Sequence, residues 1–177
     1  MCADLKAALG VPIILCSATR RRDDVLLAFK LGADDFVAKP FSLDELQARI
    51  ELALRRASPT GARPGSASAS PARLSIGTLV LEHARCRALL GDEVLPLTPT
   101  EYHVLCALAE RPGEVVGYQE LTKRVWGYHD KAIRRSLEVH VRRLRAKLNL
   151  GGRGAPQVVT QRGFGYSLVP PGRSATA

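Results

Sequence analysis

The 177-residue chain has no continuous apolar run of the ~18 residues that a membrane-spanning helix needs. Its first stretch, Met1 to Gly10, carries Asp4 and Lys6 where a signal peptide would be apolar. We therefore expect a cytoplasmic protein with neither a membrane span nor a secretory signal. Because 46% of the residues are hydrophobic, the chain can bury a core, which excludes disorder over its whole length.

The sequence also lacks the residue patterns of metal, redox and enzyme sites. Its four cysteines are scattered, with no partner at zinc-site or disulfide-exchange spacing. Cys16 and Cys106 lie inside apolar runs, as small core residues do. The sequence shows no catalytic nucleophile paired with a general base, and it shows no glycine-rich loop that would bind phosphate. We therefore expect no metal, no cofactor and no enzyme activity.

Acidic residues are scarce in the C-terminal part of the chain. The whole sequence has 26 Lys and Arg against 17 Asp and Glu, a net charge of +9. Residues 1–57 carry nine basic and eight acidic side chains, whereas residues 73–177 carry sixteen and nine. The stretch from Lys131 to Lys147 holds seven basic residues and the single acid Glu138. Such a concentrated basic stretch indicates a polyanionic partner.

Composition divides the chain into two structured parts. Residues 58–72 are almost wholly Ser, Pro, Gly and Ala, which predicts a flexible linker, and residues 170–177 predict a disordered tail. Strands and helices alternate before the linker, with expected ranges Val11–Ser17, Asp23–Leu31, Asp35–Ala38 and Leu43–Arg56. This order predicts a partial α/β fold with a parallel sheet over residues 1–57.

Beyond the linker the expected order is strands, then helices, then strands. Three short strands are expected, at Leu74–Leu81, Cys86–Leu90 and Val94–Leu97. Three helices follow, beginning at Thr98, near Tyr118 and after the loop Gly127–Lys131, and a β-hairpin closes the region at Gln157–Gln161 and Tyr166–Val169. The order predicts an α+β winged helix-turn-helix over residues 73–169.

The third of these helices has an apolar side and a basic side. At about 100° per residue, one narrow arc collects Ile133, Leu137, Val141, Leu144 and Leu148. The other side carries Arg135, Val139, Arg142 and Arg143, with Ser136 beside them. Guanidinium groups there can reach phosphates and guanine edges, and Val139 and Ser136 are small enough to meet a thymine methyl.

An arginine-rich helix face is also common on plain solvated surface, so further features are needed to favour DNA binding. Acids are nearly absent from this face, which leaves its arginines without local ion pairs. Trp126 ends the preceding helix, and Arg162 stands in the glycine-rich hairpin turn, a shape suited to a minor groove. Together these features favour DNA as the polyanion.

The segments RRSLEVHVRRLRAKL (134–148) and VVTQRGFGYSL (158–168) resemble the effector domain of OmpR/PhoB-type response regulators. LTPTEYHVLCAL (97–108) and Val125-Trp126-Gly127 fit the same family in order and spacing. The resemblance implies base contacts from Ser136, Val139 and Arg143 in the major groove and from Arg162 in the minor groove. It implies backbone contacts from Trp126, Arg135, His140, Arg142, Arg145, Thr160 and Tyr166. A packed histidine is the alternative for His140, and Glu138 stands where the family has Asp.

VPIILCSA (11–18) and GADDFVAKPF (32–41) resemble the end of a flavodoxin-like receiver domain. The resemblance implies switch positions at Ser17, Phe36 and Lys39, with Phe36 where Tyr is usual. It implies dimer-interface ion pairs from Asp35, Glu45 and Arg49, while Val25 stands where a further basic partner is expected. Adjacent Asp34 and Asp35 begin a strand, which favours a structural role over a catalytic one.

The elements that would carry the metal-binding acids and the phosphoacceptor Asp do not precede Val11, so we expect this remnant not to accept phosphate in this form. Its short parallel sheet would leave an apolar edge uncovered. We therefore expect this part to be unstable, to pair with another chain, or to reflect a truncated or mis-started reading frame.

The combined expectation is a sequence-specific transcription regulator of a two-component system that binds double-stranded DNA. The resemblance implies a homodimer on direct-repeat sites and a contact with RNA polymerase through the loop from Gly127 to Ile133. A sensor histidine kinase is expected as a partner only if the full-length receiver exists. The alternative is an interaction protein whose receiver remnant dimerises with an intact response regulator and modulates it.

Overall fold

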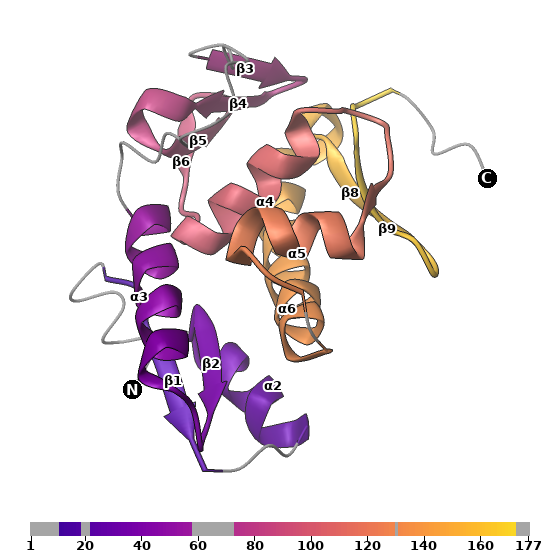
Figure 1. The fold of residues 1–177 in the computed structure, drawn as a ribbon. Helices are drawn as coiled ribbons and strands as arrows, with labels where there is room; N and C mark the ends of the chain where they lie inside the picture. Colours follow the sequence, from indigo (N-terminus) through magenta and orange to yellow (C-terminus); the bar gives the residue numbers. More distant parts are fainter. Residues whose placement is uncertain (1–10, 19–21, 58–72, 130, 173–177) are drawn as a thin grey trace.

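The computed structural model describes residues 11–18, 22–57, 73–129 and 131–172, which form two parts packed against each other (Figure 1). The expected linker at 58–72, the residues before Val11 and the end of the expected tail lie outside the described residues. The N-terminal part, residues 11–57, contains β1 (Ile14–Ser17), α2 (Arg22–Lys30), β2 (Asp35–Ala38) and α3 (Leu43–Ala57). No helix in the described ranges is long and apolar enough to cross a membrane.

The N-terminal part has the α/β pattern that its sequence predicts. Strands β1 and β2 pair in parallel, with Ile14 opposite Asp35. Helix α2 ends before Gly32, whose φ of 108° suits a residue without a side chain. Helix α3 begins after Ser42, whose Oγ accepts a hydrogen bond from the Glu45 amide at 3.1 Å. A small core forms from Val25, Ala28, Phe29, Ala33 and Phe36.

The C-terminal part, residues 73–172, opens with an antiparallel sheet of β3 (Arg73–Ile76), β4 (Leu79–Glu82), β5 (Arg87–Leu90) and β6 (Glu93–Leu95). The expected single strand over Leu74–Leu81 is wrong, because the chain turns at Gly77 and forms β3 and β4. Gly77 has a φ of 58°, and a Cβ there would lie 2.5 Å from the Gly154 carbonyl oxygen. The turn therefore requires glycine.

Three helices follow: α4 (Pro99–Ala109), α5 (Tyr118–Trp126) and α6 (Lys131–Leu148). Thr98 caps α4, because its Oγ1 accepts from the Glu101 amide at 3.3 Å while Glu101 Oε2 accepts from the Thr98 amide at 3.0 Å. The predicted apolar arc of α6 is confirmed, since all its members are buried: Ile133, Leu137, Val141, Leu144 and Leu148. These side chains join α6 to the core formed with α4 and α5.

The chain ends in a three-stranded sheet that forms the wing. Strands β8 (Gln157–Gln161) and β9 (Gly165–Val169) make the predicted hairpin, and β9 also pairs with β7 (Val116–Gly117), which the sequence did not predict. A Cβ on Gly165 would lie 2.0 Å from the Val116 carbonyl oxygen. The close pairing of β7 and β9 is therefore possible only with glycine at this position.

Helix α6 lies between the two parts. One side packs on the C-terminal core, and α2 and β2 of the N-terminal part lie against it from the other direction (Figure 1). Helix α3 lies near α4 and α5. The C-terminal part thus covers α2, β2 and α3, whereas the predicted apolar edge at β1 keeps Val11 47% exposed and Cys16 exposed.

Candidate nucleic-acid interface

Arg145 joins the wing to α6. Its Nε donates a hydrogen bond to the Val158 carbonyl at 2.7 Å, and its Nη2 donates to Thr160 Oγ1 at 2.6 Å. Its guanidinium also lies 5.8 Å from the ring centroid of Tyr166. Helix and hairpin are therefore held as one unit, which fixes the position of the wing turn relative to α6.

Two tyrosines extend this junction to the first turns of α6. Tyr166 is buried and meets Tyr118 edge-on at 5.5 Å between ring centroids. Arg134 places its guanidinium 4.2 Å over the Tyr118 ring. Burial raises the pKa of Tyr166 to about 12, so its phenol keeps its proton near neutral pH. The hydroxyl can therefore act as a hydrogen-bond donor.

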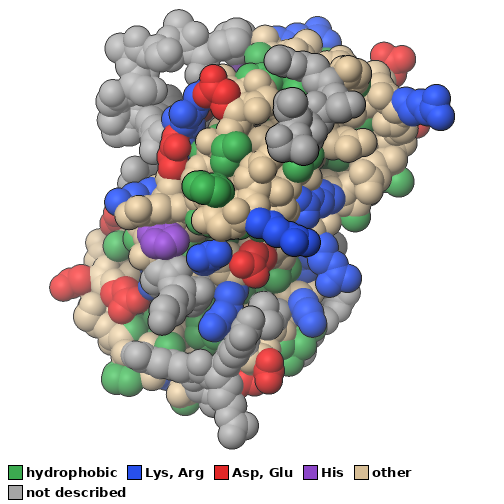
Figure 2. Space-filling view, turned by 90° about the vertical axis from the view of Figure 1, so that its right-hand side faces the viewer, with side chains coloured by type: hydrophobic (Ala, Val, Ile, Leu, Met, Phe, Trp, Pro, Cys, Tyr) green, Lys and Arg blue, Asp and Glu red, His purple; other side chains and the backbone are tan. Residues whose placement is uncertain are grey.

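Several cations of this region are open to solvent. Arg134 and Arg142 on α6 are exposed, and Arg135 is half-buried. Arg162 is exposed at the wing turn, beside Gly163 with a φ of 83° and Phe164, which is 74% exposed. Figure 2 shows Lys and Arg side chains gathered in a band across the middle of one face of the molecule. This band is a surface that suits a polyanion.

Arg143, a predicted base contact, binds the end of α2. Its Nη2 donates to the carbonyls of Phe29 and Lys30, both at 2.7 Å. The last carbonyls of a helix have no partner inside the helix, and they carry partial negative charge. Arg143 therefore caps the C-terminus of α2 in this arrangement.

The neighbouring positions on α6 are also covered. Val139 packs against the small core of the N-terminal part. The buried His140 ring lies edge-on to Phe29 at 6.3 Å and tilted to Trp126 at 5.8 Å, between ring centroids. Ser136 is fully buried, although the helical wheel placed it beside the basic side. The structure thus places Val139, His140 and Arg143 against the N-terminal part and buries Ser136, and their roles on DNA stay predictions.

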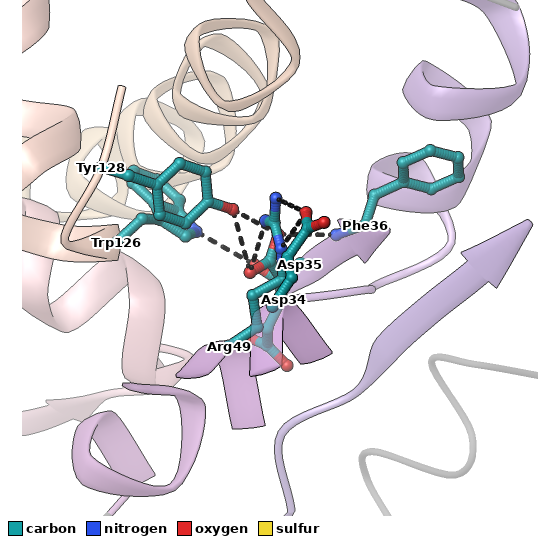
Figure 3. Close-up of polar contacts among 7 residues, drawn as sticks. Asp34, Asp35, Phe36, Arg49, Trp126 and Tyr128 are labelled. Atoms are coloured by element: carbon teal, nitrogen blue, oxygen red, sulfur yellow. Dashed lines mark hydrogen bonds and ion pairs between the residues drawn. The ribbon is translucent and has the colours of Figure 1, made fainter. Parts of the chain in front are cut away.

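Asp34 connects the two parts through its side chain and its backbone, and Figure 3 shows the backbone link to Trp126. Its Oδ1 accepts from Thr100 Oγ1 of α4 at 3.0 Å, and its Oδ2 accepts from the Ile13 amide at 2.9 Å. Its carbonyl accepts from Trp126 Nε1 at 3.2 Å. Trp126, a predicted DNA backbone contact, is therefore fully buried and bound to the N-terminal part.

The predicted dimer-interface residues form a network within one chain. Arg49 Nη1 lies 3.2 Å from Asp35 Oδ1, and Arg49 Nη2 lies 2.8 Å from Glu45 Oε1. The Tyr128 hydroxyl donates to Asp35 Oδ1 at 3.0 Å, and the Arg49 guanidinium lies 4.3 Å over the Tyr128 ring (Figure 3). No local sequence pattern points to Tyr128, because its partner Asp35 lies 93 residues before it in the chain.

The three receiver switch positions are divided between two places. The Ser17 carbonyl accepts from the Lys39 amide at 2.7 Å, so these residues meet at one end of the parallel pair. The Lys39 side chain is exposed. Phe36, in contrast, is buried in the small core that packs against Val139 of α6. The structure therefore places Phe36 near the DNA-reading helix.

Comparison with known proteins identifies the family. The family "Transcriptional regulatory protein, C terminal" matches residues 91–168. The chain is 38% identical over 171 residues to the DNA-binding response regulator MtrA of Mycolicibacterium smegmatis. The aligned region covers 97% of this chain and 71% of MtrA.

Two solved structures are similar to this chain. The DNA-binding domain of CpxR from E. coli has 34% identity and a TM-score of 0.53, over 58% of this chain and 99% of that domain. A RitR mutant with 21% identity shares the fold, with a TM-score of 0.63 over 96% of this chain and 71% of its own. These relatives do not favour the alternative of an interaction protein. The chain belongs to the OmpR/PhoB-type response regulators, a class of DNA-binding transcription regulators of two-component systems.

Proposed function

We propose that this chain binds a specific double-stranded DNA sequence, with α6 in the major groove and the wing in the minor groove. The observation that carries the proposal is the pair of hydrogen bonds from Arg145 to Val158 and Thr160, because they hold helix and wing as one reading unit. Ser136, Val139 and Arg143 would face bases, and Arg162 would enter the minor groove. Contacts to the DNA backbone would come from the seven residues that the family resemblance implies: Trp126, Arg135, His140, Arg142, Arg145, Thr160 and Tyr166.

Base reading requires the two parts to separate. Arg143 caps α2 and Val139 packs on the N-terminal core, so neither side chain can reach a base edge in the described arrangement. We call this arrangement the closed form and the separated one the open form. Specific binding then belongs to the open form.

The dimer proposal concerns the same residues. A homodimer on direct-repeat sites would use Asp35, Glu45 and Arg49, two of which bind Tyr128 in the closed form. Dimerisation and closure would therefore compete for Asp35 and Arg49. Tyr128 lies in the loop through which we propose contact with RNA polymerase, and a sensor kinase would act where a full-length receiver is present.

Selection from a pool of random duplexes tests the proposal. The chain should enrich a short repeated motif, and a variant that favours the open form, Thr100→Val, should enrich the same motif more strongly. Arg142→Ala should weaken binding to every sequence, whereas Arg143→Ala should relax the preference at one base position. A pool without any enriched motif, for both chains, would contradict the proposed function.

A further inference from the structure

A basic hollow lies where the two parts meet. It has a volume of about 430 Å³ and lies between the end of α2 and the exposed side of α6. Its lining residues are Lys30, Val139, Arg142, Arg143 and Ala146. Three of these five carry a positive charge and none is acidic. Lys30 comes from the N-terminal part, so the hollow exists in this form only while α2 covers α6.

The three cations remain able to bind an anion in the closed form. The side chains of Lys30 and Arg142 are exposed. Arg143 donates to two neutral carbonyls, and such hydrogen bonds leave the guanidinium charge in place. Their charges attract an anion, and both guanidinium and ammonium groups bind phosphate oxygens.

We infer that this hollow binds a phosphate of duplex DNA while the N-terminal part covers α6, so that the closed form holds DNA without reading its bases. The inference rests on the proposed function and adds Lys30 to the DNA-binding surface. Duplex DNA fits better than a small anion, because further exposed cations, Arg134 on α6 and Arg162 at the wing turn, lie outside the hollow in the C-terminal part. A chain of phosphates can contact several of them at once.

Closure would thus change the mode of DNA binding. Arg143 and Val139, which would touch bases, are engaged by the N-terminal part, while Arg142 stays open to solvent. Contacts to phosphates position a protein on DNA but carry no direct sequence information. The closed chain would therefore bind all duplexes alike and weakly, with a strong dependence on salt.

A salt titration with a random-sequence duplex tests the inference on the whole chain. Lys30→Ala should reduce the slope of log K against log salt by about 1, because one phosphate contact is lost. The matched control is Arg73→Ala, which removes an exposed positive charge from β3, in the sheet at the top of Figure 1. The control should keep the wild-type slope.

The outcomes separate this inference from the proposed function. If Lys30→Ala keeps the wild-type slope while Arg142→Ala reduces it, the phosphate is bound by α6 alone and not between α2 and α6, and the inference is overturned. If inorganic phosphate competes as well as an equal concentration of DNA phosphate, the hollow is a small-anion site, which also overturns it. If the wild-type chain and Thr100→Val bind no duplex at any salt concentration, the proposed function itself fails.

Opening the molecule gives an independent check on where Lys30 acts. In the Thr100→Val background, Lys30→Ala should change the slope of log K against log salt less than it does in the wild type. The reason is that α2 then lies against α6 for a smaller fraction of the time. A Lys30→Ala effect of the same size in both backgrounds would place Lys30 on DNA independently of closure and would overturn the shared hollow. Circular dichroism of each variant checks that the helix content of the chain equals that of the wild type.

Discussion

Arg143 donates two hydrogen bonds from one nitrogen to the carbonyls of Phe29 and Lys30, so the predicted base-reading arginine serves as the C-cap of α2. Because α2 lies against this guanidinium, Arg143 cannot reach the edge of a guanine while the bonds to α2 are in place. Closure and base reading therefore compete for this side chain.

The two neighbouring arginines of α6 should differ in their effect on DNA binding. Arg143→Ala should cost about 1 to 3 kcal/mol on the preferred sequence and relax the choice of one base. Arg142→Ala should weaken binding to all sequences alike and reduce the salt slope by about 1. Fluorescence anisotropy with matched and mismatched duplexes measures both. Equal loss of specificity in the two variants would show that the assignment of the reading side is wrong.

Thr100→Val should shift the chain towards the open form. Valine keeps the shape of threonine but removes the donor to Asp34 Oδ1, and a lost hydrogen bond to a buried carboxylate costs about 1 to 3 kcal/mol. Because about 1.4 kcal/mol is tenfold in an equilibrium constant, the open fraction should rise by about 5- to 150-fold. Hydrogen exchange should become faster in α2 but not in β9.

Thr122→Val is the matched control for this shift. Thr122 is equally buried, and its hydroxyl donates to the Tyr118 carbonyl at 2.9 Å within α5 and meets His129, so its partners lie in the C-terminal part alone. This variant should lower the stability of the C-terminal part without faster exchange in α2. Faster exchange of α2 in both variants would mean that Asp34 does not hold the parts together.

Local patterns made much of the C-terminal part predictable. The capping pair Thr98 and Glu101 and the apolar arc of α6 depend on residues three to four positions apart, so sequence spacing reveals them. The division of the first strand at Gly77 was missed, because apolar residues continue on both sides of the turn. The Thr78 amide donates to the Gly154 carbonyl at 2.9 Å, and a side chain at Gly77 would clash with Gly154 and Pro171, both far along the chain.

The closed form could not be predicted from spacing. The cap of α2 joins Arg143 to Phe29, and the buried bond of Asp34 joins it to Thr100, over 114 and 66 residues. A helical wheel shows that Arg143 and Val139 share a side of α6, but it does not show which surface covers that side. The family resemblance likewise predicted that DNA contacts this side of α6. In the structure, α2 and β2 lie against it instead.

High pH should destabilise the C-terminal part. Burial raises the pKa of Tyr166 from 10 to about 12 and that of Cys106 from 9 to about 12. Both groups therefore bind their protons more tightly in the folded state than in the unfolded state. Their contribution to stability is present below the unfolded values and is lost as the pH rises from about 9 to 12. Denaturant unfolding across this range measures the loss. Tyr166→Phe should flatten the profile above pH 10, and an unchanged profile would contradict the shift.

Tyr128→Phe should favour dimerisation. The variant keeps the ring beneath the Arg49 guanidinium but removes the hydroxyl that donates to Asp35, which weakens the closed form by about 1.5 to 3 kcal/mol if the bond to the carboxylate has the usual strength. The surface around Asp35 and Arg49 is then covered less often by the C-terminal part, so the dimer fraction in sedimentation equilibrium should rise with protein concentration more steeply than for the wild type. Adding Arg49→Ala should abolish the gain, because the proposed interface would use the guanidinium that pairs with Asp35 and Glu45 within one chain. A gain that persists in the double variant would place the dimer contact on another surface.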